Sequence, residues 1–200
     1  CTCNAGYWGP VIGYAASLTC TACVAGTYSA TNGATAVTQC LACPAGKYQS
    51  LAGQTKCDDC AVNTYNELTA KTVSSDCLTC GTNAASALAS SAKTSCTCNA
   101  GYWGPLMGDA ASLTCTACVA GKFSAAVGAT AIGTCLDCAT GKFQSSEGQT
   151  KCVDCAVNTY NALTAKTAEA DCKTCGANAA SAVASSAKTS CTCNAGYWGP

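Results

Sequence analysis

The stretch Cys1-Thr-Cys-Asn-Ala-Gly-Tyr-Trp-Gly-Pro10 opens the chain and recurs unchanged from Cys96 and from Cys191. The residues between these copies also repeat in register, and 71 of 95 positions are identical between residues 1–95 and 96–190. Self-similarity at a fixed period is typical of repeat architectures. We interpret residues 1–95 as one tandem unit, 96–190 as a second, and 191–200 as the start of a third.

Within each unit, cysteine doublets recur about every 19 residues and divide it into five modules. Three residues after each doublet stands Gly or Asn, which accept a left-handed backbone and predict a sharp turn. An aromatic residue follows two positions later in every module but the fifth. We expect the aromatic residues to pack between modules or to make assembly contacts, with ligand contact as the alternative. They are Tyr7, Trp8, Tyr28, Tyr48, Tyr65, Trp103, Phe123, Phe143, Tyr160 and Trp198.

The composition argues against an ordinary globular core. The 200 residues include 22 Cys, but only 6% are aromatic and 10% are charged. Little apolar area is available for burial, whereas closing a loop of about 15 residues with a disulfide stabilises by about 3 kcal/mol. Dense cysteines also indicate an oxidising, extracellular or cell-surface location. Because the chain begins in mid-pattern, we interpret it as a window from a longer secreted protein.

Pairing the second cysteine of each doublet with the first of the next brackets one complete module per bond. The predicted disulfides are Cys3–Cys20, Cys23–Cys40, Cys43–Cys57, Cys60–Cys77, Cys80–Cys96, Cys98–Cys115, Cys118–Cys135, Cys138–Cys152, Cys155–Cys172 and Cys175–Cys191. Ladder or crossed connectivities stay open, because spacing alone does not determine pairing. Zinc binding is the rival chemistry, but the doublets form an unbroken series, one per unit is a tighter C-x-C, and no His accompanies them.

Charge and residue types exclude several functions. Ten lysines balance ten acids, with no basic cluster of the kind that binds nucleic acid or anionic membranes. No apolar run approaches the roughly 20 residues that cross a bilayer. The absence of His removes the usual general base. We therefore expect no enzyme, cofactor or metal, and interpret the acids as solvated surface groups. Those of one unit are Asp58, Asp59, Glu67 and Asp76.

We predict a small disulfide-rich repeat array, mostly irregular, with short β-hairpins and the form of an elongated solenoid-like rod. Fragments such as Thr27-Tyr-Ser29 predict short strands after tight turns. In the fifth module, Asn83 precedes an alanine-rich segment ending at Lys93, which predicts one short helix per unit. Exposed hydroxyls in loops are candidate O-glycosylation sites, with turn hydrogen bonding as the alternative. The candidates are Thr35, Thr55, Thr69 and Thr72.

The segment Cys43-Pro-Ala-Gly-Lys-Tyr-Gln-Ser-Leu-Ala-Gly-Gln-Thr-Lys-Cys57-Asp-Asp-Cys60 resembles ephrin-receptor-like and TNF-receptor-like cysteine-rich repeats, of the form C-P-x-G-x-Y…G…C-x-x-C. The modules from Cys23 and Cys138 match well, and those from Cys60 and Cys80 less closely, because Asn replaces Gly. The Cys1-Thr-Cys-Asn-Ala-Gly-Tyr7 segment resembles the end of an EGF-like module. Long arrays of this kind are similar to surface and flagellar-hair proteins of algae and other protists. The resemblance implies disulfide-stapled rods without catalysis.

Two functions follow as expectations. The first is an extracellular structural protein that self-associates into a filament or surface fibre, because repeated interfaces propagate. The alternative is the stalk of a cell-surface receptor or adhesin that displays a binding domain elsewhere. Near-identity of the units disfavours a ligand site within the array, since such sites usually need unlike surfaces.

Overall fold

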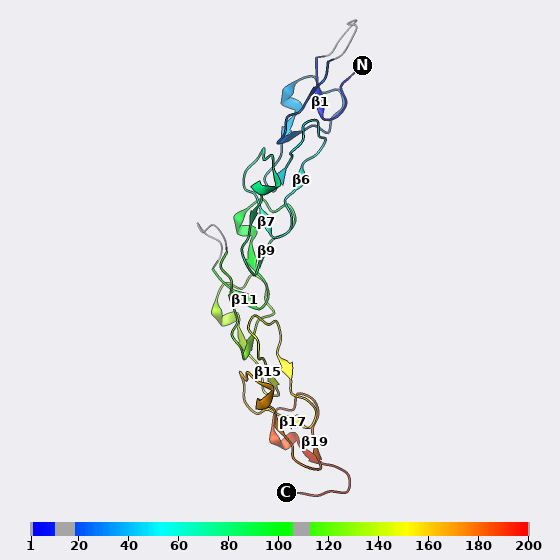
Figure 1. Ribbon diagram of the computed structural model, residues 1–200. Coiled ribbons are helices and arrows are strands. Elements are labelled where there is room, and N and C mark those ends of the chain that lie inside the picture. Colours follow the sequence, from blue (N-terminus) through cyan, green and yellow to red (C-terminus); the bar gives the residue numbers. More distant parts are fainter. Residues whose placement is uncertain (1, 11–18, 106–112, 200) are drawn as a thin grey trace. The chain divides into compact units, whose positions relative to one another are not determined.

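The computed structural model describes residues 2–10, 19–105 and 113–199 (Figure 1). Within these ranges the chain forms two compact units. The first contains the described residues up to 97 and Leu113, and the second contains 98–105 and 114–199. Both consist of two-residue strands, long loops and single 3₁₀ turns, without an α-helix in the described residues. This confirms the prediction of a mostly irregular, disulfide-rich repeat with short hairpins.

Ten disulfides close ten successive loops, which we number as modules one to ten. They join Cys3–Cys20, Cys23–Cys40, Cys43–Cys57, Cys60–Cys77, Cys80–Cys96, Cys98–Cys115, Cys118–Cys135, Cys138–Cys152, Cys155–Cys172 and Cys175–Cys191. These are the pairs obtained when the second cysteine of each doublet is joined to the first cysteine of the next doublet. Most of the loops span 16 or 17 residues, but modules three and eight span only 14.

In the first unit, each aromatic strand pairs antiparallel with the two residues that lie within the next doublet. The pairs are β1 (Tyr7–Trp8) with β2 (Thr21–Ala22), β3 (Thr27–Tyr28) with β4 (Leu41–Ala42), β5 (Lys47–Tyr48) with β6 (Asp58–Asp59), and β7 (Thr64–Tyr65) with β8 (Leu78–Thr79). The remaining elements are β9 (Ala84–Ala85) and the 3₁₀ turns η1 (Val37–Gln39), η2 (Ser74–Asp76) and η3 (Lys93–Ser95).

The second unit repeats this arrangement, and β10 (Thr97–Cys98) precedes its first hairpin. Its pairs are β11 (Tyr102–Trp103) with β12 (Thr116–Ala117), β13 (Lys122–Phe123) with β14 (Leu136–Asp137), β15 (Lys142–Phe143) with β16 (Val153–Asp154), β17 (Thr159–Tyr160) with β18 (Lys173–Thr174), and β19 (Ala179–Ala180) with β20 (Thr192–Cys193). Its 3₁₀ turns are η4 (Ile132–Thr134), η5 (Glu169–Asp171) and η6 (Lys188–Ser190).

Each hairpin starts at a tight turn with a left-handed residue. In module three, the Lys47 N–H donates to the carbonyl oxygen of Pro44 (N···O 3.1 Å), and Gly46 has a φ of 80°. A type II turn requires positive φ at this position and favours Gly or Asn there. Asn63 has a φ of 65° at the equivalent place in module four, so Gly and Asn are confirmed as the turn signal.

The prediction of an alanine-rich helix between Asn83 and Lys93 is wrong. Asn83 has a φ of 59° and starts a turn, and strand β9 follows it directly. The Cys80–Cys96 disulfide ties this segment into the same loop as in the other modules. A helix of about ten residues gains too little from its own hydrogen bonds to compete with that constraint. Only the 3₁₀ turn η3 is helical here.

Neighbouring modules are joined through backbone hydrogen bonds at three recurring positions. Between modules three and four, the donors and acceptors are Gly46 to Asn66 (2.7 Å), Gln49 to Lys71 (2.9 Å) and Ala70 to Cys43 (2.8 Å). The same three bonds recur between modules eight and nine, with Gly141, Gln144 and Ala165 as donors. The modules therefore satisfy backbone groups on each other, in place of packing a large apolar core.

Candidate functional site: the boundaries between modules

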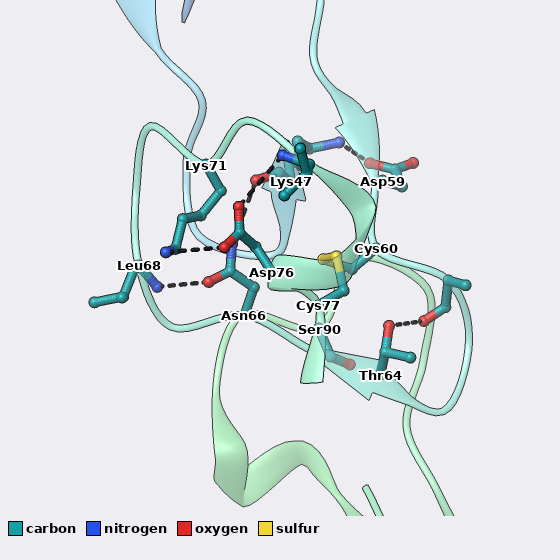
Figure 2. The surroundings of a disulfide bond; sticks show 12 residues. Lys47, Asp59, Cys60, Thr64, Asn66, Leu68, Lys71, Asp76, Cys77 and Ser90 are labelled. Carbon is teal, nitrogen blue, oxygen red and sulfur yellow. Dashed lines mark hydrogen bonds and ion pairs between the residues drawn. A yellow bond between two sulfur atoms is a disulfide. The ribbon is translucent and has the colours of Figure 1, made fainter. Parts of the chain in front are cut away.

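A buried side-chain amide lies at the boundary between modules three and four. Asn66 is 2% exposed, and its Nδ2 donates to the carbonyl oxygen of Lys47 in the preceding module (3.4 Å). Its Oδ1 accepts the N–H of Leu68 (3.0 Å), as Figure 2 shows. Asn161 is buried in the same way and bonds Lys142 (3.0 Å). A buried amide stabilises only when both of its ends are paired, so these asparagines hold adjacent modules together.

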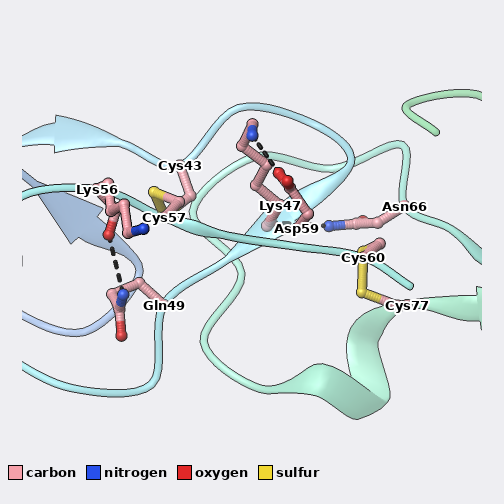
Figure 3. A network of polar contacts seen from close by, with 9 residues as sticks. All are labelled: Cys43, Lys47, Gln49, Lys56, Cys57, Asp59, Cys60, Asn66 and Cys77. Carbon is pink, nitrogen blue, oxygen red and sulfur yellow. Dashed lines mark hydrogen bonds and ion pairs between the residues drawn. A yellow bond between two sulfur atoms is a disulfide. The ribbon is translucent and has the colours of Figure 1, made fainter. Parts of the chain in front are cut away.

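The glutamine at the equivalent place in module three is also buried and paired. Gln49 Nε2 donates to the Lys56 carbonyl oxygen (2.9 Å), as seen in Figure 3, and its Oε1 accepts the Leu51 N–H (3.0 Å). Sequence reasoning missed this position. The available signal was a polar residue directly after the aromatic or its substitute in modules two to five. These residues are Ser29, Gln49, Asn66 and Ser86, and in the second unit Ser124, Gln144, Asn161 and Ser181.

The predicted aromatic residues differ widely in burial. Tyr65 and Phe143 are 3% and 8% exposed, and Tyr65 also forms a parallel bridge to Ser90 of the next module. Burial raises the pKa of Tyr65, and the charge of Glu67 raises it further. Trp198, in contrast, lies outside the strands and is 95% exposed. The other aromatic side chains of the predicted set, apart from exposed Tyr7, are half-buried; they are Trp8, Tyr28, Tyr48, Trp103, Phe123 and Tyr160.

Tyr7 reaches two modules along the chain. Its Oη lies 2.8 Å from the place where a β-carbon on Gly53 would stand, so the ring covers the turn of module three. Tyr102 and Gly148 repeat this contact in the second unit, at 2.6 Å. Gly53 and Gly148 have φ values of 74° and 68°, a left-handed backbone that favours Gly, and a larger residue there would also have to displace the tyrosine hydroxyl.

Lys and Asp residues face each other across three of the hairpins. Lys47 and Asp59 are directly opposite on β5 and β6 and form an ion pair, which Figure 3 shows. The Lys122–Asp137 pair in module seven has its charged atoms 2.5 Å apart, and modules eight and three share the same arrangement. Because these side chains are at least a third exposed, each pair contributes at most about 1 kcal/mol.

Three of the four acids, although they lie at the surface, also make specific polar contacts. Asp59 is paired as above. Asp76 lies 3.2 Å from the Lys71 Nζ, as Figure 2 shows, and accepts the backbone N–H groups of Val73 and Thr72. The hydrogen bond from Lys71, with those from the backbone, holds the pKa of Asp76 below its ordinary value, against a smaller opposing effect of desolvation.

Asp171 occupies the same place in the second unit. Its pKa is also lowered, first by the Ala168 N–H and then by Lys166, whose Nζ is 3.4 Å away. The third acid, Glu67, accepts the backbone N–H of Lys93 in module five through its Oε1 (2.8 Å). Carboxylates therefore fasten turns and neighbouring modules, and the second unit lacks the Glu67 contact because Ala162 replaces it.

The remaining candidate positions lie on the surface. The side chains of Thr35, Thr55, Thr69 and Thr72 are all exposed, and O-glycosylation there stays a prediction. In the described ranges, no group of three or more Cys, Asp or Glu side chains is placed to hold a metal ion. The same part of the chain contains no helix with the length and apolar character needed to span a membrane.

Two segments of the chain match a known family. Residues 35–77 and 130–172 match the family described as tyrosine-protein kinase ephrin type A/B receptor-like. Each match runs from the end of one module through the next two closing disulfides, so both segments are similar to ephrin-receptor-like cysteine-rich repeats. None of the curated proteins matches the chain. Such repeats, stapled by disulfides, are typical of extracellular domains without catalytic activity.

Proposed function

We propose that this chain is a structural segment of an extracellular protein, and that its modules assemble into a filament or surface fibre. The observation that carries the proposal is the set of three backbone hydrogen bonds repeated between modules three and four and between modules eight and nine. One boundary geometry is used repeatedly, so each module presents its successor with the same docking surface. Repeats of this kind extend in one dimension.

Exposed apolar side chains provide the contacts between copies. Leu51, Leu68 and Leu88 occupy corresponding loop positions in modules three, four and five, and each is more than half exposed. Leu163 and Val183 repeat two of these positions in the second unit. Single exposed apolar residues are ordinary, but a series at matched positions is complementary to the same series on another copy. The zero net charge gives no long-range repulsion between copies.

A stalk that carries a separate binding domain is the second candidate. The match of residues 35–77 and 130–172 to a family described as receptor-like favours it. A stalk requires the same stapled modules but no lateral association. The two candidates therefore differ in one property, which is self-assembly of the oxidised chain.

Electron microscopy and sedimentation velocity of the oxidised chain test the proposal. We expect concentration-dependent fibres with an axial repeat set by the 95-residue unit. The triple variant Leu51→Ser/Leu68→Ser/Leu88→Ser should abolish them. A matched variant, Ala30→Ser/Ala52→Ser/Ala61→Ser, adds serines at exposed alanines and should assemble normally. Discrete monomers at every concentration would refute the filament and favour the stalk.

A further inference from the structure

A cationic pocket lies at the boundary between modules nine and ten. It has a volume of about 520 Å³, and its lining includes three lysines, Lys166, Lys173 and Lys188, but a single carboxylate, Asp171. Lys166 is paired with Asp171 (3.4 Å). Among the described residues, neither Lys173 nor Lys188 takes part in an ion pair. The pocket therefore presents two uncompensated positive charges.

The first unit shows what occupies the equivalent place there. Glu67 extends to module five, and its Oε1 accepts the Lys93 backbone N–H (2.8 Å). The corresponding residues of the second unit are Ala162 and Lys188. Alanine has no side-chain oxygen, and in the described structure the Lys188 N–H donates to no protein acceptor. The first unit thus places the Glu67 carboxylate against this backbone N–H, whereas the second unit has no carboxylate there.

A second substitution changes the charge in the same direction. Leu78 lies opposite Tyr65 on β8, whereas Lys173 lies opposite Tyr160 on β18. The second unit therefore loses an acid and gains a cation in one pocket, whose lining also includes the half-buried Tyr160. An aromatic ring with adjacent donors suits a ligand that has both an apolar face and an anionic group.

We propose that this pocket binds the carboxylate or sulfate group of an acidic saccharide, in the position that the Glu67 carboxylate fills in the first unit. The anionic group accepts the Lys188 N–H and pairs with the Lys173 and Lys188 ammonium groups. The sugar ring packs against Tyr160. The equivalent pocket of the first unit does not bind, because Glu67 occupies the donor and repels a second anion. This assignment does not depend on whether the chain assembles.

Isothermal titration of the oxidised 200-residue chain with a sulfated dextran oligosaccharide tests the site. We expect one site per chain, with affinity that falls as salt is added. A neutral dextran oligosaccharide of equal length should not bind, and inorganic sulfate should bind more weakly because it lacks the ring. Equal affinity for inorganic sulfate would overturn the saccharide assignment, and equal affinity for neutral dextran would overturn the anionic one.

Exchanging residues between the units provides the matched variants. Ala162→Glu/Lys173→Leu converts the pocket to its first-unit counterpart and should weaken binding at least about tenfold, because a competing carboxylate replaces a cation. Glu67→Ala/Leu78→Lys should add a second site in the first unit. Lys151→Leu removes an exposed charge outside the pocket and should leave affinity unchanged. Unchanged binding by the first variant, or an equal loss with Lys151→Leu, would overturn the proposal.

Discussion

The carbonyl oxygen of Ala70 lies 2.5 Å from the place where a β-carbon on Gly26 would stand, although Gly26 belongs to module two and Ala70 to module four. Gly46 has the same relationship with Ala89 of module five. Gly26 and Gly46 therefore have two roles: each forms the turn of its own module and admits the turn of the next module but one.

Comparing Gly26→Ala with Gly176→Ala separates the cost of the left-handed backbone from the cost of the close contact. Gly176 also has a positive φ of 100°, but no atom of the described residues lies within 4 Å of the place where its β-carbon would stand. Gly176→Ala should cost about 1 kcal/mol, from backbone strain alone. Gly26→Ala should cost about 2–4 kcal/mol, because overpacking adds about 1–3 kcal/mol. Amide hydrogen exchange of each module measures both, and equal losses would contradict the close contact.

Removing one disulfide should loosen the chain locally. In Cys60→Ala/Cys77→Ala, a loop with a sequence separation of 17 is released, which costs about 3 kcal/mol. Because modules interact mainly with near neighbours, and the Ala70 turn of module four also contacts module two, amide exchange should accelerate in modules two to five and stay unchanged in modules eight to ten. The equivalent Cys155→Ala/Cys172→Ala variant should give the reverse pattern. Uniform acceleration in both variants would show instead that the units unfold as one.

Truncating Asn66 should destabilise the boundary between modules three and four. Asn66→Ala leaves the Leu68 N–H and the Lys47 carbonyl oxygen without their amide partner, at a cost of about 1–3 kcal/mol. Denaturant unfolding with intact disulfides measures this loss. Asn194→Ala, at an exposed position, should be neutral. A neutral Asn66→Ala would show that the amide fills space without fastening the modules.

Acid should loosen the η2 turn. Because the pKa of Asp76 is lowered in the folded chain, its ionised form stabilises the fold above the ordinary aspartate pKa, near 4. This stabilisation is lost as the pH falls through the lowered value. The amide resonances of Thr72 and Val73, which bond the carboxylate, should shift in that range. Asp76→Asn should abolish the transition, whereas Asp58→Asn should retain it.

Local rules in the sequence were sufficient for the hairpins. The period, the doublets and the Gly or Asn before each aromatic specify a turn followed by a short strand, as at Gly46 and Asn63. The helix predicted for the alanine-rich segment does not form, because helix propensity is too weak to compete with a disulfide-closed loop. The role of Asn66 was not predictable from its own module, since its amide bonds a carbonyl of the preceding one.

The contact between Gly26 and Ala70 was hidden for the same reason. A left-handed conformation explains either Gly or Asn equally well, so nothing in the sequence indicates that a distant carbonyl excludes the β-carbon of Asn. Only the approach of module four to module two distinguishes the two residues. Likewise, the contact of Glu67 was not predictable from its own module, because its partner, the Lys93 N–H, lies in the following module.

The order Gly, Gly, Gly, Asn, Asn at the left-handed positions predicts how the number of modules in such chains can change. The three glycines of a unit face turns two modules ahead, and the two asparagines carry β-carbons that such turns cannot approach. Deleting module six alone would remove Gly101, whose missing β-carbon admits the Gly148 carbonyl oxygen. Asn83 would then be the left-handed residue two modules before Gly148, and its β-carbon would clash with that oxygen. Duplication or loss of all five modules together would preserve every pairing, so we expect the length of such chains to change by whole units.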